Sequence, residues 1–256
     1  MKMGVLGAAG RMGQSVCEAI SKDNNLELVA AVDLGSNDAL EVVEGIHLTS
    51  EIEDLITSGS QVVIDFTMAE ASRENLPILA KAGLNVVVGT SGLNSDDLDE
   101  FKKVFLESSC LVVPNFAIGA VLMMHFAAIA APWFNTAEII EYHHDNKIDA
   151  PSGTAIATAE KIAAASNEWN GDPTTEENLL NSRGAHGEAG VKVHAVRMEG
   201  MVAHQDVILG TTGQTLTIRH DAIDRESFMP GVLLAAKGIE DLPNGLIVGL
   251  DAILGI

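Results

Sequence analysis

The stretch Gly7-Ala8-Ala9-Gly10-Arg11-Met12-Gly13 decides which fold the sequence predicts. An apolar segment, residues 1–6, precedes it, and residues 11–21 follow with apolar side chains at helical spacing. Residues 26–32 form a second apolar segment, which ends at Asp33. This order of strand, glycine turn, helix, strand and acid is typical of a dinucleotide-binding βαβ unit.

The three glycines and Asp33 each suit a dinucleotide. Gly7 allows the tight turn, Gly10 lets the backbone approach the pyrophosphate at the helix N-terminus, and Gly13 allows close packing of helix on strand. Asp33 can accept hydrogen bonds from a ribose hydroxyl. The spacing is G-x-x-G-x-x-G and not the commonest G-x-G-x-x-G, so an ordinary βα turn with three glycines is the alternative.

The end of the second strand bears on the choice of cofactor. A carboxylate at Asp33 repels the 2′-phosphate of NADPH. Leu34 stands where a phosphate-binding Arg could have been, and only Arg11 could compensate. We therefore expect NADH to be the preferred cofactor and NADPH a possible one.

Strands and helices alternate beyond this unit, which predicts a parallel, doubly wound sheet. Residues 39–58 are a mixed stretch, and Ser95 is the expected N-cap of a later helix. The segments with clear patterns are strands at 61–66, 85–88 and 111–113 and helices at 69–82 and 95–107. Ligands collect at the carboxyl ends of such strands, although each residue there could be a plain loop position. The residues at these ends are Phe66, Thr67, Gly89, Thr90, Ser91, Val113, Pro114, Asn115 and Phe116.

A second stretch, residues 138–154, reads E-I-I-E-Y-H-H-D-N-K-I-D-A-P-S-G-T and carries the chemistry. It predicts a short strand, a polar loop and a helix that Ser152 caps. Two imidazoles, an ammonium and backbone N–H groups at a helix start suit a small acidic substrate that must be bound and protonated. The alternative is a surface histidine pair with a solvated lysine. The candidate residues are His143, His144, Lys147, Gly153 and Thr154.

Composition limits the kinds of partner. The chain has 256 residues, 47% of them hydrophobic, and a formal net charge of −21, which argues against nucleic-acid binding. Cys17 and Cys110 have no metal-ligand spacing, so we expect no metal and a reducing, cytoplasmic location. Residues 1–6 do not look like a signal peptide. The apolar stretch 116–134 is interrupted by glycine, histidine and proline, which indicates a buried helix and no membrane span.

The pattern predicts two domains. Residues 1–116 with 226–256 form a Rossmann-type, doubly wound dinucleotide-binding domain, and residues 117–225 form a smaller α+β domain for substrate binding and tetramerisation. Strand-like segments after residue 190 supply the second sheet. A cleft between the two domains would bring the histidine loop over the nucleotide.

With both stretches considered, the chain resembles the 4-hydroxy-tetrahydrodipicolinate reductase (dihydrodipicolinate reductase) family over essentially its full length. The family motif E-x-H-H-x-x-K-x-D-A-P-S-G-T-A matches residues 141–155 without a gap. G-x-x-G-R-M-G matches residues 7–13, D-F-T matches residues 65–67, and G-T-[ST]-G matches residues 89–92. The family's basic residue after the second-strand acid is replaced by Leu34, which departs from the pattern of NADPH users.

The resemblance implies a role for each matching residue. His143 would be the proton donor, and His144 would contact substrate. Lys147 would bind substrate and has been assigned a proton-donor role, and Gly153 with Thr154 would hold a substrate carboxylate. The implied cofactor contacts are Gly7, Ala8, Ala9, Gly10, Arg11, Met12, Asp33, Phe66, Thr67, Gly89, Thr90, Ser91, Val113, Pro114, Asn115, Phe116, Arg225 and Phe228.

The implied activity is reduction of 4-hydroxy-tetrahydrodipicolinate to tetrahydrodipicolinate by hydride from NAD(P)H, in the diaminopimelate route of lysine biosynthesis. The implied partners are a small dicarboxylate and three further copies of the chain, with no nucleic acid and no membrane. Two other classes stay open: another two-domain NAD(P)-dependent dehydrogenase, and a non-catalytic nucleotide sensor. The first would lack the 141–155 run, and the second would be expected to have lost His143 or Lys147.

Overall fold

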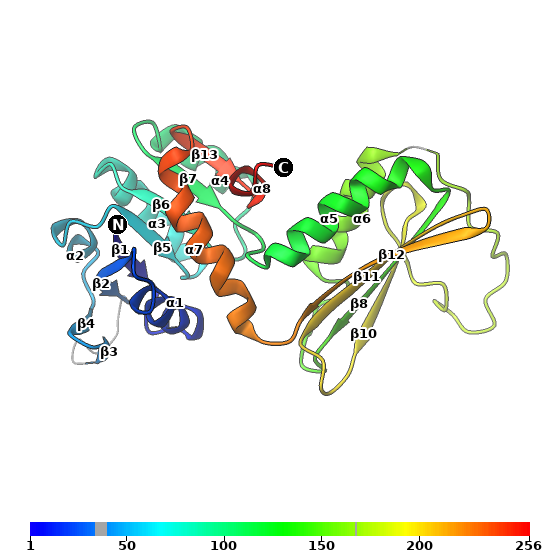
Figure 1. Cartoon of the computed structure of the whole chain (residues 1–256), viewed down its shortest axis with the longest axis horizontal. Coiled ribbons are helices and arrows are strands. Elements are labelled where there is room, and N and C mark those ends of the chain that lie inside the picture. Colours follow the sequence, from blue (N-terminus) through cyan, green and yellow to red (C-terminus); the bar gives the residue numbers. More distant parts are fainter. Residues whose placement is uncertain (34–39, 167) are drawn as a thin grey trace. The chain divides into compact units, whose positions relative to one another are not determined.

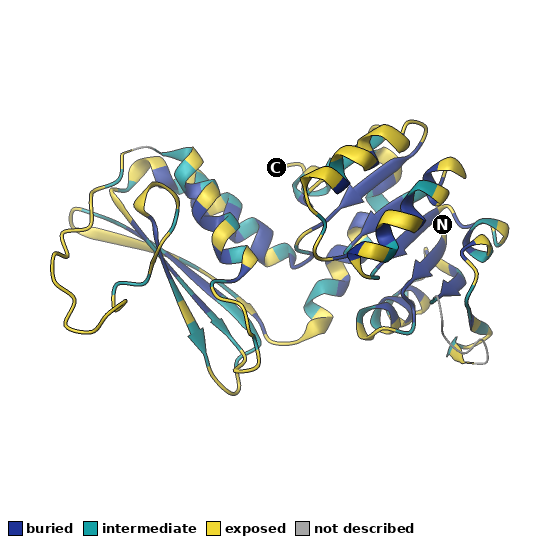
Figure 2. Cartoon of the chain, turned by 180° about the vertical axis from the view of Figure 1, so that it is seen from behind, coloured by how far each residue is buried: buried dark blue, intermediate teal, exposed yellow. Residues whose placement is uncertain are grey.

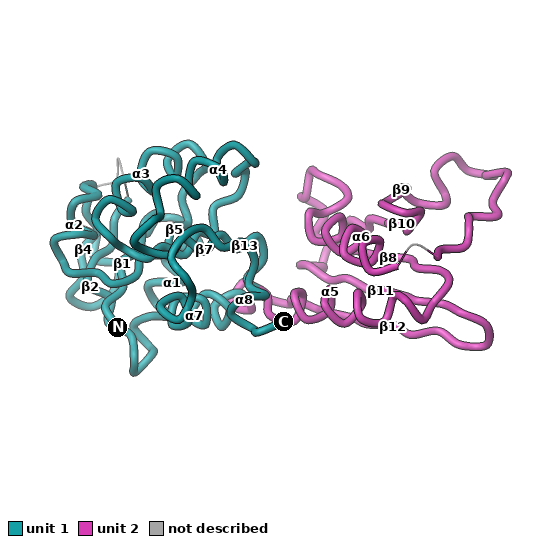
Figure 3. The backbone as a smooth tube through the Cα atoms, turned by 90° about the horizontal axis from the view of Figure 1, so that it is seen from above, with its two compact units in different colours: residues 1–116, 228–256 teal, residues 117–227 magenta. Residues whose placement is uncertain are grey.

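The computed structural model describes residues 1–33, 40–166 and 168–256, so Leu34 lies outside the described residues. The chain forms two compact units. Unit 1 comprises residues 1–116 and 228–256, and unit 2 comprises residues 117–227 (Figure 3). The chain therefore leaves unit 1, builds the whole of unit 2 and then returns.

The centre of unit 1 is an eight-stranded sheet in the order β13-β7-β6-β5-β1-β2-β4-β3 (Figure 1). Every neighbouring pair is parallel except β3 with β4, which is antiparallel. The expected doubly wound parallel sheet is confirmed. The strands are β1 (Lys2–Leu6), β2 (Glu27–Val32), β3 (Glu41–Val43), β4 (Ile46–Thr49), β5 (Val62–Asp65), β6 (Asn85–Val88), β7 (Ser109–Val112) and β13 (Gly245–Val248).

Helices cover both faces of this sheet. Figures 1 and 3 show α1 and α7 on one face and α3 and α4 on the other, and the members of each pair contact one another. The helices of unit 1 are α1 (Arg11–Ser21), α2 (Glu53–Thr57), α3 (Ala69–Lys81), α4 (Ser95–Val104), α7 (Met229–Gly238), η4 (Ile239–Asp241) and α8 (Asp251–Leu254).

The core of unit 1 lies along the strands. Figure 2 shows the strands as mostly buried and the outer sides of the helices as exposed. All four residues of β5, V-V-I-D, are buried. A parallel strand that is covered on both faces reads as a continuous apolar run, which explains why these strands could be found from the sequence.

The start of α4 differs from the expected cap at Ser95. The Asn94 side chain accepts hydrogen bonds from the backbone N–H groups of Asp96 and Asp97, at 2.9 and 3.1 Å. The Asp97 carboxylate in turn accepts one from the Asn94 N–H, at 2.8 Å. Asn94 is the cap because Asp97 stands three residues after it and completes a reciprocal capping box.

Unit 2 is a five-stranded sheet, in the order β12-β11-β8-β10-β9, on which α5 and α6 pack. Burial alternates along β8, and Ala137, Ile139 and Glu141 are its buried residues. Gln205, opposite Glu141, bonds to Thr158 of α6 at 2.7 Å, so this face lies under the helix. The elements are α5 (Ile118–Ala130), η1 (Ala131–Trp133), β8 (Thr136–His143), α6 (Gly153–Ala165), β9 (Ala185–His186), η2 (Glu188–Gly190), β10 (Lys192–Arg197), β11 (Ala203–Thr211), β12 (Gln214–Ala222) and η3 (Arg225–Phe228), which reaches into unit 1.

The length and apolar character of the helices bear on whether one of them could cross a membrane. Helix α5 is the most apolar of them and has 13 residues. None of the described helices combines the length and the apolar character that crossing a membrane requires.

Candidate active site

The glycine turn of unit 1 is shaped by close backbone contacts. Gly7 has φ of +82°, a conformation that disfavours any side chain, and its N–H donates to Val32 O at 2.8 Å. A Cβ on Gly13 would lie 2.1 Å from Gly7 O, and one on Gly10 would lie 3.2 Å from the same atom. The turn therefore presses α1 against the end of β1, as the dinucleotide pattern requires.

The cap of α1 leaves room for an anion. Gly10 is the N-cap residue, no side chain caps the helix, and no acid lies in its first turn. Arg11 and Met12 are the first two helical residues, and Ala8 and Ala9 lie in the turn before them. A helix start of this kind favours a phosphate.

Asp33 contacts the same turn. The Ala9 N–H donates to Asp33 Oδ2 at 2.9 Å, while the backbone N–H of Asp33 donates to Thr49 O at 2.9 Å. The carboxylate thus lies beside the glycine turn, which is the position from which an acid reaches a ribose hydroxyl. The turn, the uncapped helix and the acid together fit a dinucleotide.

The carboxyl ends of β5 and β6 are joined by a buried carboxylate. Asp65 accepts hydrogen bonds from Thr67 N–H at 2.9 Å, from the Thr67 hydroxyl at 2.6 Å and from the Ser72 hydroxyl at 2.6 Å. Ser72 also lies 3.0 Å from the hydroxyl of Thr90. Burial raises the pKa of Asp65, against the effect of these hydrogen bonds. Asp65 therefore positions two of the predicted cofactor contacts.

Two aromatic rings lie among the other predicted contacts at this edge. The Phe66 and Phe116 ring centroids are 5.5 Å apart. A Cβ on Gly89 would lie 2.3 Å from the Phe66 ring, so a side chain at this position would force the ring to move. Ser91 follows Thr90 after β6, and Val113, Pro114 and Asn115 lead from β7 to Phe116. The structure thus brings the ends of β5, β6 and β7 together.

The last two predicted cofactor contacts, Arg225 and Phe228, lie where the chain returns from unit 2 to unit 1. Phe228 precedes α7, and Gly231 in the first turn of α7 would place a Cβ 2.0 Å from Phe116 O. The start of α7 therefore packs against the exit of β7. Arg225 belongs to unit 2 and begins η3.

The loop of unit 2 begins at a buried carboxylate. Glu141 Oε2 lies 2.5 Å from His143 Nδ1. Arg197 on β10 binds both oxygens of Glu141, with Nη1 to Oε2 and Nη2 to Oε1 at 2.9 Å each. Arg197 Nη2 also donates to Asp149 O at 2.7 Å, and Ser152 N–H donates to Glu141 Oε1 at 3.2 Å. One carboxylate therefore connects the imidazole, the neighbouring strand and the helix start.

The pKa values of Glu141 and His143 are both lowered, but for different reasons. Burial works to raise the pKa of Glu141, but the hydrogen bonds from Arg197 and His143 outweigh it and hold that pKa below its usual range. Burial lowers the pKa of His143, and Lys147 and Arg197 add to the effect, while Glu141 opposes it. The buried carboxylate does not raise the imidazole pKa overall because burial of the imidazole itself outweighs it, with smaller contributions from Lys147 and Arg197.

The rest of the loop carries the predicted substrate contacts. Lys147 Nζ donates to both oxygens of Asp149, at 2.7 and 2.8 Å. His144 is exposed beside it, and the Lys147 N–H donates to His144 O at 3.2 Å. The peptide bond between Ala150 and Pro151 is cis.

The start of α6 confirms the expected cap. The Ser152 hydroxyl accepts a hydrogen bond from Ala155 N–H at 3.2 Å, and Gly153 and Thr154 are the first two helical residues. A Cβ on Gly153 would meet no atom within 4 Å, and Gly153 does not have a positive φ. Neither packing nor backbone conformation requires glycine at this position.

Sequence reasoning missed two residues of this arrangement. Glu141 was part of the matching motif but received no role, although its spacing of two from His143 on a strand predicts a shared face. Arg197 was not considered, and no local pattern links it to Glu141. Within the described residues, no group of three or more histidine, cysteine or acidic side chains could hold a metal ion.

These features define a class of protein: a two-unit α/β oxidoreductase with a dinucleotide-type glycine turn on one unit and a loop that carries histidine and lysine side chains on the other. Residues 1–116 match the family described as dihydrodipicolinate reductase, N-terminus, and residues 119–254 match its C-terminus. The chain belongs to the dihydrodipicolinate reductase family.

Relatives support this assignment over the full length. The 4-hydroxy-tetrahydrodipicolinate reductases of Corynebacterium aurimucosum and Thermobifida fusca are each 47% identical over 262 residues, covering all of this chain and 99% and 100% of theirs. The dipicolinate-bound dihydrodipicolinate reductase of Paenisporosarcina sp. TG-14 has a TM-score of 0.88 and 35% identity, covering 99% of both chains. A probable dehydrogenase of Thermotoga maritima, at 12% identity and a TM-score of 0.67, shares the fold.

Proposed function

We propose that this chain reduces 4-hydroxy-tetrahydrodipicolinate to tetrahydrodipicolinate with NAD(P)H, in the diaminopimelate route of lysine biosynthesis. The observation that carries the proposal is the connection through Glu141 in unit 2. This carboxylate binds both His143 and the Ser152 N–H that precedes the start of α6. A proton donor and an anion-binding helix start are thereby held at a fixed separation, as a dicarboxylate that must be protonated requires.

Unit 1 is the cofactor-binding unit in this proposal, and residues 117–225 bind substrate. When bound, the nicotinamide supplies the hydride. The glycine turn from Gly7 to Gly10, with Arg11 and Met12, holds the pyrophosphate, and Asp33 holds the ribose. The residues at the ends of β5, β6 and β7, with Arg225 and Phe228, hold the remaining part of the dinucleotide.

The protein's own contribution to the chemistry is charge control. As negative charge develops on the substrate ring, a proton from His143 neutralises it. Lys147, His144 and the backbone N–H groups of Gly153 and Thr154 bind the carboxylates, and the open space beside Gly153 leaves room for one. These groups make the site locally positive in a chain of net charge −21.

NADH is the preferred cofactor in this proposal, with NADPH a possible one. Asp33 supports it because its carboxylate lies beside the turn that would receive the adenosine ribose, where a 2′-phosphate is repelled. Turnover with each cofactor at matched concentrations tests the preference. Equal or faster turnover with NADPH would contradict it.

The protein works as a cytoplasmic homotetramer in this proposal, joined through the sheets of unit 2. The outer strand β12 supports the assembly because most of its residues are exposed in the single chain. Sedimentation equilibrium tests the stoichiometry, and a single-chain mass at micromolar concentration would contradict it. Detection of the protein in the membrane or exported fraction of its cell would contradict the location.

A coupled assay tests the activity. The substrate is generated in the cuvette from pyruvate and aspartate semialdehyde by the preceding synthase, and the loss of NADH and NADPH absorbance is followed in parallel. Rapid oxidation that depends on the synthase supports the proposal. Nucleotide binding without oxidation would favour the sensor alternative. Dipicolinate, which is bound to the Paenisporosarcina protein, should compete with substrate here.

A further inference from the structure

Glu141 is a buried charged side chain of unit 2 that has partners on three elements. Its side chain is 1% exposed, and its partners come from the end of its own strand, from β10 and from the residue that caps α6. A carboxylate buried in this way is costly unless all its oxygens are bonded. Here both oxygens have partners, so the arrangement has a defined geometry.

The partners of Glu141 determine where the proton of His143 lies. Arg197 is always protonated and only donates, and it keeps Glu141 ionised. An ionised carboxylate only accepts, so the short contact at 2.5 Å must be an Nδ1–H bond from His143 to Glu141. Nε2 is therefore the nitrogen that is left to exchange a proton with substrate.

We propose that Glu141, held by Arg197, is the positioning residue of the proton donor: it fixes the tautomer and the orientation of His143, so that the proton leaves from Nε2. This inference rests on the proposed function. In the step, the Nε2–H bond of the imidazolium breaks, and the proton binds the ring atom on which hydride addition places an electron pair. His143 is left neutral, with Nδ1–H still bonded to Glu141, and takes a new proton from water.

Arg197 has a second role in the proposal. A lone buried carboxylate at hydrogen-bond distance would hold the imidazolium too strongly for it to act as an acid. Arg197 compensates that charge, and His143 otherwise faces burial, Lys147 and Arg197 itself, all of which lower its pKa. The same guanidinium binds Asp149 O, so the imidazole and the lysine loop are positioned by one pair of residues.

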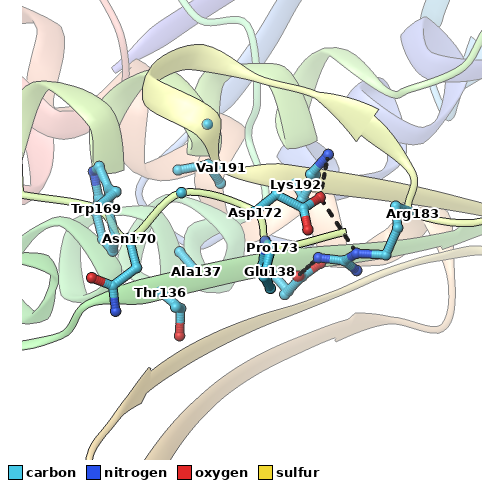
Figure 4. Close-up of a pocket in the computed structure, with 12 residues that line it drawn as sticks. Thr136, Ala137, Glu138, Trp169, Asn170, Asp172, Pro173, Arg183, Val191 and Lys192 are labelled. Atoms are coloured by element: carbon cyan, nitrogen blue, oxygen red, sulfur yellow. Dashed lines mark hydrogen bonds and ion pairs between the residues drawn. The ribbon is translucent and has the colours of Figure 1, made fainter. Parts of the chain in front are cut away.

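A second cluster on the same strand provides a matched control. Glu138 binds Arg183 at 2.7 Å, and Arg183 also lies near Asp172, which binds Lys192 (Figure 4). Glu138 also binds His194, at 2.6 Å. This cluster combines glutamate, arginine and histidine as the Glu141 cluster does, and its glutamate lies three residues before Glu141 on β8. It has no bond to residues 143–154, so Glu138→Gln tests the loss of such a cluster without loss of the imidazole contact.

The first test is spectroscopic and does not depend on activity. The protein is labelled with ¹⁵N-histidine, and the resonances of His143, one of eight histidines, are assigned by their absence in His143→Gln. The neutral imidazole is expected as the Nδ1–H tautomer. In Glu141→Gln, the amide oxygen should face Ser152 and Arg197 and the NH₂ should face His143, which selects the Nε2–H tautomer. Glu138→Gln should leave the His143 tautomer unchanged. An Nε2–H tautomer in the wild type would overturn the proposal, whatever the variants do.

The second test is kinetic. Glu141→Gln is expected to lower kcat by about 10²- to 10⁴-fold, the range for a lost general acid, with a much smaller change in KM. The double variant Glu141→Gln with His143→Gln should lose little more kcat than His143→Gln alone, because both substitutions remove the same proton-donating function. The pH at which kcat/KM declines should also move lower in Glu141→Gln, because the favourable charge is lost. Glu138→Gln should leave kcat within about threefold of the wild-type value, because Glu138 does not bind the imidazole of His143.

The outcomes separate the two proposals. A loss under threefold in Glu141→Gln, or losses that multiply in the double variant, would overturn the positioning role. A wild type that oxidises neither NADH nor NADPH would overturn the proposed function, and an Nδ1–H tautomer in that protein would still support the fixed imidazole. If Glu141→Gln fails to fold, the wild-type tautomer alone decides.

Discussion

Lys147 Nζ donates to both carboxylate oxygens of Asp149, two residues further along the loop. The side chain of Asp149 is 60% exposed, while that of Lys147 is 21% exposed. The cation that we propose for a substrate carboxylate therefore already binds a carboxylate of the protein, on the side open to water. If Lys147 binds substrate as proposed, the substrate carboxylate replaces that of Asp149.

Lys147→Ala should weaken substrate binding more than it weakens the fold. A hydrogen bond to a charged group contributes about 1.5–3 kcal/mol, so KM should rise by roughly 10- to 100-fold, with a lower kcat. The melting temperature should change little, because exposed ion pairs add little stability. Lys103→Ala, which removes an exposed pair with Glu100, is the control for both measurements. An unchanged KM would contradict the carboxylate role of Lys147.

His143→Gln should lower kcat by about 10²- to 10⁴-fold, because the proton donor is lost while a polar side chain of similar size takes its place. The coupled assay measures this change at saturating cofactor. His47→Gln, at an exposed position of β4, should leave kcat unchanged. A loss smaller than threefold in His143→Gln would remove His143 from the acid role.

As the pH rises, the activity should begin to decline at a lower pH than it would if His143 had the usual histidine pKa. Burial lowers the pKa of His143, and its acid form predominates only below that pKa. The decline of kcat/KM, which reports the free enzyme, should therefore have its midpoint below the usual value of about 6.5. A bound dicarboxylate favours the imidazolium, so the decline of kcat should occur at higher pH. A kcat/KM that stays level from pH 6 to pH 8, about the usual titration range of histidine, would contradict this assignment.

Two glycines should respond in opposite ways to alanine. Gly13→Ala places a Cβ 2.1 Å from a backbone oxygen and should destabilise the fold by at least about 2–3 kcal/mol. Gly153→Ala meets only open space and should keep or slightly raise the melting temperature. It should nevertheless raise KM about tenfold or more, because the methyl group occupies the space proposed for a carboxylate. Gly171→Ala, also in open space, is the control, and a normal KM in Gly153→Ala would contradict the proposed carboxylate site.

Asp33→Asn should shift the cofactor preference. The amide oxygen can still accept the Ala9 N–H, but the repulsion of a 2′-phosphate is removed. The ratio of kcat/KM for NADPH to that for NADH should rise on the order of tenfold, which corresponds to about 1.4 kcal/mol. Glu27→Gln removes an exposed charge from the same strand and should leave the ratio unchanged. No change in Asp33→Asn would show that Asp33 does not select the cofactor.

The sequence predicted best where a pattern was both strong and local. Helix α1 spans Arg11–Ser21, as its apolar spacing indicated, and β6 spans Asn85–Val88. The hairpin of β3 and β4 was missed, because its strands have only three and four residues within a mixed stretch. Gly45, with φ of +80°, marks its turn and was the available signal.

The site was predictable in its residue types but not in its connections. Residues 143–154 are contiguous, so their proximity followed from the sequence. Glu141 and Arg197 are 56 positions apart, and only the parallel pairing of β8 with β10 brings them together. Asp65 is similar, because its burial depends on the packing of Ser72 and Thr90 from two later segments.

The position of β13 has a consequence for the synthesis of the protein. Because β13 pairs with β7 and follows all of unit 2, a nascent chain completes unit 2 before unit 1. At about 5–20 residues per second, the ribosome needs on the order of 10 s to make the intervening segment. During that interval β7 is an unpaired edge of an incomplete sheet, open to chaperones and to wrong partners. A chain released early would therefore carry a complete unit 2 and a unit 1 that lacks its last strand.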